Sequence, residues 1–461
     1  MNTNNKNNIQ NQKNELNNNN IPTNIIIIGG GIVGCSTAYY LTKLYKDQVN
    51  VTLIEKYKIA GCASGKAGGF LAGNWGDDET NQLHQKGFQL HEQLAKELKL
   101  KSYRKIQTLS YAYNNNNKKR KKKQNIIDKN NTIRPSWMQN EPADVSMMDT
   151  DIAQVTPYEL TTNLMNHAIQ NGAKLIIGNV IGIENDEEEN NNNSSSPPAN
   201  DNQEEANGNK QQYNVSHVIL EENNRKLKCD KVIITLGPWS VLAEDWFNDY
   251  SSLKVPMEGI RSSSIVLYNQ QEEEDNVASN EEQQPYAIFC NEDERTNTHL
   301  EIYPRPDHSI YMCGLGGSEH CNKKRIIELI PESVKPDETR IRAALKCFHN
   351  MSGRNIQDDE VSKNKIETNC CMRPCPQDGK PMMGMIPNYN NAYICCGHNC
   401  WGILWGPISG LSMSELMMNG KSSSIDLNAF TPKRFVKRRK RKGKGQQRGR
   451  HQVDIPKGEQ W

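Results

Sequence analysis

The feature that most constrains the fold is a glycine-rich turn between an apolar run and a helix-like segment. Residues 25–28 are four consecutive isoleucines, and the sequence GGGIVG follows at 29–34. Residues 35–44 favour a helix, and residues 49–54 favour a second strand that ends at Glu55. A β-branched run followed by a glycine turn, a helix and another strand is typical of a βαβ unit. The sequence therefore predicts two parallel strands joined by a helix.

Each part of this unit has a physical role in binding a dinucleotide. Gly29 permits the tight turn, Gly31 lets the backbone approach a pyrophosphate, and Gly34 allows close packing of helix on strand. The helix N-terminus attracts the negative charge of the pyrophosphate. Glu55 follows Gly31 by 24 residues and can accept both hydroxyls of a ribose. This carboxylate would repel the 2′-phosphate of NADP. The alternative interpretation is a glycine turn that binds no ligand.

Composition indicates two ordinary domains diluted by polar segments. The chain has 461 residues, of which 35% are hydrophobic, and its mean hydropathy is −0.80. Asn-rich tracts at 1–24, 114–117, 190–212 and within 270–284 account for this low value. Such tracts bury too little apolar surface to offset the entropy of ordering, so we expect them to be disordered. The net charge of +2 excludes no class of binding partner, but residues 118–123 (KKRKKK) and 433–450 are strongly basic.

Cysteine usage and the start of the chain bear on location. The odd count of 13 cysteines and the adjacent pairs at 370–371 and 395–396 favour reduced thiols in a reducing compartment. The polar, Asn-rich start does not resemble a signal peptide. Residues 25–42 lack charge, but their four glycines argue against a membrane span, and we expect no integral membrane segment. We predict a cytoplasmic protein, with endosome-associated or nuclear location as alternatives.

Further along the chain, the pattern changes from helix–strand alternation to strands and back. Residues 157–170 predict an amphipathic helix that Gly172 ends, and residues 174–183 predict one strand. Residues 213–220 and 225–229 are expected to pair, and residues 231–235 form a buried strand. A second domain with an antiparallel sheet is predicted from strand-like runs at 262–268, 286–290, 298–303 and 309–314, interrupted by a helix at 336–349. Residues 373–420 return to short strands, glycine loops and a helix.

Three further motifs carry a specific resemblance. They are CASGKAGGFLAGNW at 62–75, TLGPWS at 235–240 and GHNCWGILWGP at 397–407. In this order and spacing, the chain resembles the D-amino-acid-oxidase-like family of FAD-dependent oxidoreductases, which includes glycine and sarcosine oxidases. Within that family it is similar to a eukaryotic subgroup of oxidoreductases of unsettled substrate. Taken alone, the segment at 62–72 also fits a flexible loop.

The resemblance implies an α/β (α+β) fold. It consists of a glutathione-reductase-type, Rossmann-like FAD-binding domain and a substrate domain built on an antiparallel sheet. We assign the FAD-binding domain to 24–113, 131–184, 213–254 and 370–432, and the substrate domain to 255–369. The remaining segments are predicted as a disordered Asn-rich tail (1–23), a flexible basic insert (114–130), a disordered insert (185–212) and a disordered basic tail (433–461).

The family also implies which residues hold FAD. The glycine turn and Glu55 would bind the pyrophosphate and the ribose, and the segment after it would run along the pyrophosphate and the ribityl chain. The backbone of Val180 would meet the adenine, a second loop would close over the cofactor, and the helix start after 397 would lie beneath the flavin. The full set is Gly29, Gly31, Ile32, Val33, Gly34, Glu55, Lys56, Ser64, Gly65, Lys66, Ala67, Gly68, Gly69, Val180, Gly237, Trp239, Gly397, His398, Trp401, Gly402 and Ile403.

Two residues are expected to act on the substrate. Arg373 heads the sequence RPCPQDGKP, which resembles the family segment whose arginine grips a substrate carboxylate. A guanidinium pairs bidentately with a carboxylate; the alternative is a structural ion pair, for example with Asp378. Tyr303 shares a predicted strand face with Glu301 and would line the pocket, unless the two form a surface pair. Cys400 stands where glycine oxidases place a second arginine, which leaves the flavin better supported than an amino-acid substrate. His398 either donates a hydrogen bond to the flavin or packs beside the loop.

A zinc site is the main alternative for the cysteine-rich region. Cys371 and Cys375, and then Cys396 and Cys400, have tolerable ligand spacing. Successive side chains of a strand face opposite ways, so Cys395 and Cys396 could not both ligate one ion. We therefore predict FAD as the cofactor and no metal.

The predicted function is the oxidation of a small amine or amino acid by hydride transfer to flavin N5. The expected partners are an amine or carboxylate substrate and O2 or another electron acceptor. One alternative is a flavin-bound regulatory or trafficking protein with weak or no catalysis. Another is a zinc- or nucleic-acid-binding protein, since the basic tail at 433–450 could contact nucleic acid or an anionic membrane. That tail could equally be a solvated extension or a nuclear localisation signal.

Overall fold

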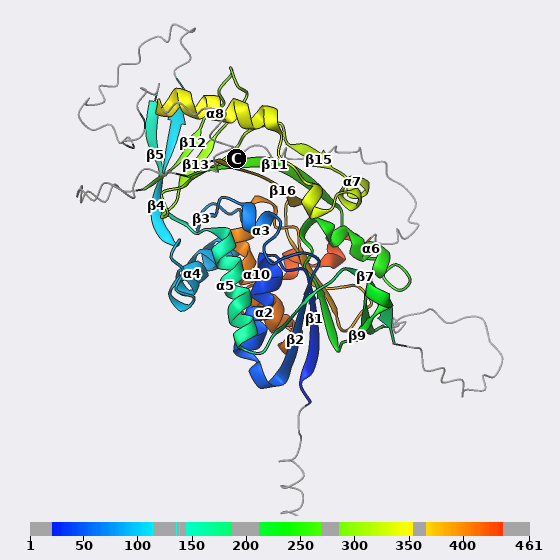
Figure 1. Ribbon diagram of the computed structural model, residues 1–461. Coiled ribbons are helices and arrows are strands. Elements are labelled where there is room, and N and C mark those ends of the chain that lie inside the picture. The colour runs from blue at the N-terminus through cyan, green and yellow to red at the C-terminus, as the bar shows by residue number, and fades with distance from the viewer. Residues whose placement is uncertain are drawn as a thin grey trace, which may run out of the picture.

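The structure is a computed structural model that describes residues 21–113, 135, 138, 144–186, 212–268, 285–353 and 366–436. Figure 1 shows a smaller sheet with its helices in the lower half and a broad curved sheet arching above it. The segments predicted as disordered lie outside the described residues, apart from their ends. At those ends, strand β7 (Val180–Asn185) and the 3₁₀ helix Pro432–Phe435 run past the boundaries that we predicted.

The lower sheet has six strands built around β1 (Thr23–Ile28). The β1 strand pairs in parallel with β2 on one side and β10 on the other, as the βαβ pattern predicted. The sheet order is β17 (Met382–Met385), β18 (Ala392–Cys396), β10 (Lys231–Ile234), β1, β2 (Val49–Glu55) and β6 (Lys174–Ile177). Only β17, at one edge, runs antiparallel to its neighbour. The β1 strand is buried on both faces, which explains its unbroken run of isoleucines.

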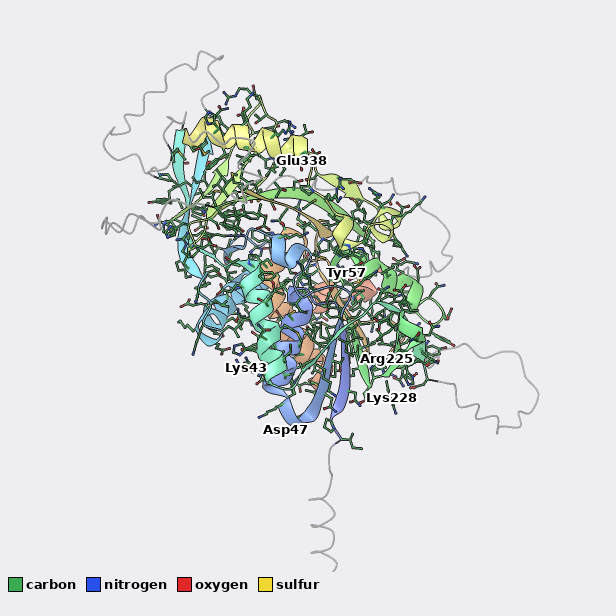
Figure 2. The ribbon with its side chains drawn as sticks, in the orientation of Figure 1. Lys43, Asp47, Tyr57, Arg225, Lys228 and Glu338 are labelled. Atoms are coloured by element: carbon green, nitrogen blue, oxygen red, sulfur yellow. The ribbon has the colours of Figure 1, made fainter. Side chains whose placement is uncertain are left out.

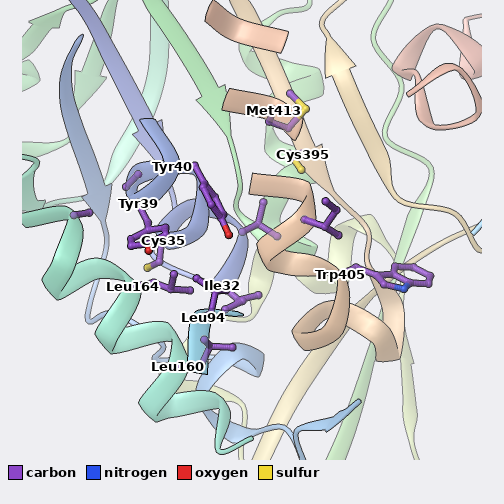
Figure 3. Packing of buried hydrophobic residues seen from close by; sticks show 14 of the residues in the cluster. Ile32, Cys35, Tyr39, Tyr40, Leu94, Leu160, Leu164, Cys395, Trp405 and Met413 are labelled. Carbon is purple, nitrogen blue, oxygen red and sulfur yellow. The ribbon is translucent and has the colours of Figure 1, made fainter. Parts of the chain in front are cut away.

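Helix α2 (Ile32–Leu44) is the most deeply buried helix of this layer. Eleven of its 13 residues are buried, because it packs on the sheet and also on α5 (Pro157–Gln170) and α10 (Gly402–Asn419). Figure 3 shows Ile32 and Cys35 of α2 close to Leu160 and Leu164 of α5. Helix α4 (Asn81–Glu97) packs on α10 from outside. A helix that is surrounded in this way carries apolar residues on all sides.

The other face of the six-stranded sheet is covered by smaller elements. A three-stranded sheet contains β7, β8 (Val215–Leu220) and β9 (Lys226–Lys228), and the pairing of β8 with β9 confirms the predicted hairpin. The short helix α6 (Ala243–Trp246) and its flanking residues complete a second apolar cluster on this face. The single strand that we predicted at 174–183 is wrong. The chain breaks at Gly178, whose amide donates to the Glu55 carbonyl, so β6 and β7 enter different sheets.

The upper sheet has nine strands and is mostly antiparallel. Eight follow the order β15 (Glu319–Cys321), β11 (Met257–Leu267), β14 (Ile310–Cys313), β13 (Glu301–Pro304), β12 (Tyr286–Cys290), β4 (Arg104–Ala112), β5 (Asp144–Gln154) and β3 (Phe70–Ala72), and β16 (Ile366–Pro376) pairs with β11. Helix α8 (Glu338–Ser352) lies across its outer face, and Figure 2 marks its first residue, Glu338. The short helix α7 (Lys323–Glu328) contacts the end of this sheet near β15.

Membership of the upper sheet differs from the sequence-based division, which placed residues 370–376 of β16 in the FAD-binding domain. Strands β3, β4 and β5 come from segments that we assigned wholly to the FAD-binding domain, yet they pair within the upper sheet. The join is β4 with β12, a parallel pair of strands that lie far apart in the sequence. Local patterns predict strands but not their distant partners, so the sequence could not reveal this pairing.

The two layers meet at the carboxyl ends of the parallel strands. Figure 2 marks Asp47, just before β2, at the lower edge and Tyr57, just after β2, near the boundary between the layers. Ligands of open α/β sheets bind outside the carboxyl ends of the strands. The upper sheet therefore covers the edge at which a ligand would sit.

Gly410 of α10 offers a test of the close packing on α2. A Cβ atom at this position would lie 2.5 Å from the Cβ of Ser36 and 2.7 Å from backbone atoms of Ser36 and Thr37. We expect Gly410→Val to lower the free energy of unfolding by about 3 kcal/mol through overpacking, measured by urea denaturation. The control is Gly182→Val, since nothing lies within 4 Å of a Cβ there. Equal stability of the two variants would contradict this account.

Candidate functional site

A cavity of about 600 Å³ lies where the two layers meet. Its walls come from the glycine turn after β1, the segment that follows β2, the start of α10 and the inner face of the upper sheet. Most of the predicted site residues line it, although they come from distant parts of the chain. They are Gly29, Gly31, Ile32, Val33, Glu55, Lys56, Ser64, Ala67, Gly68, Gly69, Val180, Gly237, Trp239, Tyr303, Arg373, Gly397, His398, Trp401, Gly402 and Ile403.

Three predicted residues stand outside this lining. A Cβ at Gly34 would lie 2.0 Å from the Gly29 carbonyl oxygen, and one at Gly65 would lie 2.1 Å from the Ala60 carbonyl oxygen. Both glycines therefore serve close backbone packing. The Lys66 ammonium donates a 3.0 Å hydrogen bond to the Cys370 carbonyl, which ties the short helix α3 (Ala63–Lys66) to β16.

The glycine turn directs the start of α2 into the cavity. Gly29 adopts a φ of 113°, which favours glycine, and a Cβ there would meet the Thr235 carbonyl oxygen at 2.5 Å. Helix α2 begins at Ile32, whose N–H donates to the Ser64 hydroxyl at 2.9 Å. The capping residue is Gly31, which has no side chain to bond the first turn. The positive end of the helix dipole is therefore open to an anion.

Glu55 is fixed at the end of β2 beside this helix start. One carboxylate oxygen accepts the Gly30 N–H at 2.7 Å, and the other accepts the Tyr57 N–H at 3.0 Å. The side chain lines the cavity, so its remaining lone pairs can accept ligand hydroxyls. A role of Glu55 in binding a ribose stays a prediction.

The start of α10 forms the floor on the opposite side. The helix begins at Gly402, and no side chain caps it. The His398 Nε2 lies 2.9 Å from the Ser409 hydroxyl, so His398 packs beside the loop with a partner inside the protein. Burial lowers the pKa of His398 to about 4, which leaves its ring neutral near pH 7. A second buried histidine, His91 of α4, bonds the Ile403 carbonyl at 2.9 Å and orients the same helix start.

Arg373 is a cation that forms no ion pair with any of the described residues. It projects from β16, lines the cavity, and its Nε is buried without a hydrogen-bond partner among the described residues. Burial would lower the pKa of this guanidinium, but the nearby Cys400, Cys375 and Cys371 thiols and Glu301 raise it. The suggested structural ion pair with Asp378 is wrong, because Asp378 accepts Arg434 at 2.7 Å.

Glu301 and Tyr303 lie on the inner face of the upper sheet. Tyr303 is only 4% exposed, so the two do not form a surface pair. The Tyr303 hydroxyl donates to a Glu301 carboxylate oxygen, and the Cys313 thiol lies 3.4 Å from the same oxygen. Burial, followed by the Glu301 charge, raises the pKa of Tyr303 well above its usual value. Tyr303 therefore stays protonated and positions Glu301.

Of five neighbouring aromatic residues in the cavity, sequence reasoning predicted Tyr303 and Trp401 and missed Phe70, Trp75 and Phe289. Phe70, Trp75 and Phe289 line the cavity together with Tyr303 and Trp401, and we refer to these five residues as the aromatic wall. They come from β3, the loop after it, β12, β13 and the segment before α10. Alternation in 286–290 predicted a strand, but it could not tell which ring would face a cavity.

The cysteine-rich strand β18 has the geometry that we predicted for it. Cys395 packs into the cluster on the α2 side of the sheet, and Cys396 into the cluster on the opposite side. Across the described ranges, no group of three or more His, Cys, Asp or Glu residues is placed to hold a metal ion. The same part of the chain contains no helix long and apolar enough to cross a membrane.

These features fit a flavin dinucleotide. The open start of α2 suits a pyrophosphate, and Glu55 suits a ribose. Gly68 and Gly69 let the backbone along the cavity pack closely, because a Cβ would lie 2.6 Å from the Tyr303 ring at Gly68 and 1.8 Å from the Val155 carbonyl oxygen at Gly69. The start of α10 and the half-buried Arg373 of the upper sheet line the same cavity. A parallel sheet with such a cradle, covered by an antiparallel sheet with polar groups, defines a two-domain flavoprotein.

The chain belongs to the FAD-dependent oxidoreductase family. The family model described as "FAD dependent oxidoreductase" matches residues 24–416, which confirms the predicted family, the flavoenzyme class and FAD as the cofactor. A curated relative, TDA3 of Saccharomyces cerevisiae, is 25% identical over 526 residues, covering 89% of this chain and 94% of its own. Its name ascribes an oxidoreductase activity to it without naming a substrate.

Solved structures share the fold. Glycine oxidase from Geobacillus kaustophilus matches with a TM-score of 0.62 and 16% identity, covering 90% of this chain and 100% of its own. L-Amino acid deaminase from Proteus myxofaciens, solved with anthranilate, matches with a TM-score of 0.63 and 17% identity, covering 90% and 94%. These likenesses confirm the α/β architecture with its Rossmann-like FAD-binding part.

Substitution of Gly31 tests the FAD cradle without disturbing the core. A Cβ there would lie 3.1 Å from the Ser64 hydroxyl and 4.0 Å from the Ser64 Cβ, the next nearest atom, so a larger side chain enters the cavity. We expect Gly31→Trp to fold but to lose the flavin absorbance of the purified protein. Circular dichroism provides the control for folding. A folded variant that keeps its yellow colour would contradict the assignment.

The buried histidines predict a specific pH dependence of stability. Burial lowers the pKa of His91 to about 4, so the unfolded chain binds an extra proton between pH 4 and the ordinary value of 6.5. Stability is therefore lost as pH falls through this window, by about 3 kcal/mol in full. His91→Gln keeps a donor but does not titrate, so its melting temperature should fall less than that of the wild type. An equal fall in melting temperature from pH 7 to pH 5 in the variant and the wild type would contradict this.

Proposed function

We propose that this protein oxidises a small amine or amino acid at the carbon that bears the nitrogen. The observation that supports this most strongly is the Arg373 guanidinium, which lines the cavity, has no anionic partner among the described residues and carries a buried Nε without a hydrogen-bond partner among them. An unpaired buried charge is costly, so the site gains most when a ligand supplies the anion. A carboxylate fits a guanidinium in a bidentate way, which points to a carboxylate-bearing substrate.

The residues that would hold FAD follow from the cradle. The glycine turn and the start of α2 would bind the pyrophosphate, Glu55 the ribose, and the start of α10 the flavin ring. When bound, FAD supplies a two-electron acceptor for a hydride from the substrate carbon. The uncapped start of α10 favours negative charge nearby.

The protein's own groups would orient and enclose the substrate. Arg373 would bind the carboxylate and thereby fix the direction of the reacting C–H bond. The aromatic wall would exclude water, which strengthens every charged contact in the site. The substrate loses a hydride and a proton and becomes an imine, which water hydrolyses to a carbonyl compound and ammonia or an amine.

The identity of the electron acceptor defines the enzyme's subclass. Reoxidation by O2 would make the protein an oxidase that forms hydrogen peroxide, and another acceptor would make it a dehydrogenase. Mixing the reduced protein with air-saturated buffer and following the flavin absorbance distinguishes the two.

The cytoplasmic location of the protein also stays a prediction, which microscopy of the tagged chain would test.

Arg373→Ala tests the proposed carboxylate site. We expect the variant to keep its flavin colour but to bind benzoate about 10- to 100-fold more weakly, because a charged hydrogen-bonded pair is lost. Binding is measured from the change in flavin absorbance. The matched control is Arg261→Ala, which removes an arginine of the same sheet that already pairs with Glu319 at 2.8 Å. Unchanged benzoate binding by Arg373→Ala would refute the assignment.

A further inference from the structure

A second charged residue in the cavity lining, Glu301, forms no ion pair with any of the described residues, and its position limits which substrates fit. The Glu301 carboxylate accepts hydrogen bonds from Tyr303 and Cys313 on one oxygen, and neither donor is a cation. Among the described residues, no lysine, arginine or histidine lies within ion-pair distance of Glu301. Its second oxygen carries no bond to any of those residues, and the side chain lines the cavity. Glu301 is therefore available to a cationic or hydrogen-donating ligand group.

The register of the upper sheet fixes the surroundings of Glu301. On one side, Glu301 pairs directly with Phe289 of β12, and on the other with Cys313 of β14. Tyr303 pairs with Tyr311 two residues along, so these side chains share the inner face. The carboxylate thus stands at the edge of the aromatic wall.

Arg373 faces the same part of the cavity from β16. Burial raises the pKa of the Cys313 and Cys400 thiols; the Glu301 charge raises it further and the Arg373 charge lowers it, so both thiols feel both charges. Nevertheless, the two charged side chains form no ion pair with each other. One cation and one anion, separated but sharing a cavity, suit a ligand that carries both charges.

The aromatic wall adds a third binding element. The ring centroids of Phe70, Trp75 and Phe289 lie 5.2 to 5.7 Å apart, and Tyr303 stacks on Phe70 at 5.6 Å. The ring of Trp401 extends this group at 6.2 Å from Trp75. Phe70, Trp75, Phe289 and Trp401 are only partly buried, so they offer apolar surface to the cavity. A ligand side chain that covers these rings gains roughly 25 cal/mol per Å² of buried apolar surface.

We propose that the substrate is an α-amino acid with a large apolar side chain, and that Glu301 binds its amino group. Arg373 binds the carboxylate of this substrate, and the aromatic wall binds its side chain. Glycine leaves the wall uncovered, a simple amine leaves Arg373 unpaired, and a carboxylic acid without nitrogen leaves Glu301 unpaired. This inference rests on the proposed oxidation of amines or amino acids.

The test uses the full-length, FAD-loaded protein and five probes under anaerobic conditions. Both enantiomers of phenylalanine carry all three groups, 3-phenylpropionate lacks the amino group, 2-phenylethylamine lacks the carboxylate, and glycine lacks the side chain. We expect one enantiomer of phenylalanine to bleach the flavin at a concentration about tenfold or more below that of glycine or 2-phenylethylamine. The analogue 3-phenylpropionate should shift the flavin spectrum without bleaching it.

Variants separate the role of Glu301 from a general structural role. Glu301→Gln should weaken the binding of phenylalanine about tenfold or more, since the contact with the amino group changes. The affinity for 3-phenylpropionate, which has no amino group, should stay within about twofold of the wild-type value. Phe289→Ala tests the wall independently, should Glu301→Gln fail to fold. Phe289→Ala should weaken the binding of phenylalanine about tenfold and leave the binding of alanine unaffected.

The outcomes distinguish this inference from the proposed function. If glycine or 2-phenylethylamine bleaches the flavin at least as readily as phenylalanine, the inferred substrate class is wrong. The proposed oxidation of amines or amino acids would then still hold. Equal weakening of phenylalanine and 3-phenylpropionate in Glu301→Gln would overturn the contact with the amino group. If no amine or amino acid bleaches the flavin of a properly loaded protein, the proposed function itself fails.

Discussion

The close approach of helix α2 to strand β1 is the constraint on which the rest of the structure depends. Gly34 lies so near the Gly29 carbonyl that no side chain fits between them. The Thr235 hydroxyl secures the turn by donating to the Ile28 and Gly29 carbonyls at 2.9 and 3.0 Å. Because the helix is held this close to the sheet, its first turn opens at the strand ends. The direction of its dipole, and therefore the anion site, follows from this packing.

A second set of contacts places the upper sheet over that site. The Tyr311 hydroxyl donates to the Lys66 carbonyl at 3.1 Å, and the Lys66 ammonium donates to the Cys370 carbonyl. A Cβ at Gly68 would meet the Tyr303 ring at 2.6 Å, so the backbone presses directly on the aromatic face. The segment predicted to run along the cofactor thus also joins the two layers. Cofactor cradle and substrate groups are held in one rigid arrangement, as efficient positioning requires.

Much of the architecture could be predicted because its signals are local. The isoleucine run, the glycine turn and Glu55 predicted a parallel βαβ unit, and β1 does pair in parallel with β2. The helix predicted at 157–170 has those bounds in the structure. The pairing of β4 with β12 could not be predicted, since strand propensity does not identify a partner about 180 residues away. Nor could periodicity at Gly178 show that one apolar run divides between two sheets.

The sequence by itself determined the cofactor class, because backbone contacts with a dinucleotide require glycines and a carboxylate at fixed local spacing. It also pointed to Arg373 through a short motif around that residue. Only the tertiary structure decided which side chains line the substrate part of the cavity. Glu301, Phe289, Trp75 and Arg373 come from segments spread over about 300 residues, and the curvature of the upper sheet brings them to one cavity. The physical reason is that side-chain recognition depends on distant strand pairing, whereas phosphate recognition depends on one turn and one helix end.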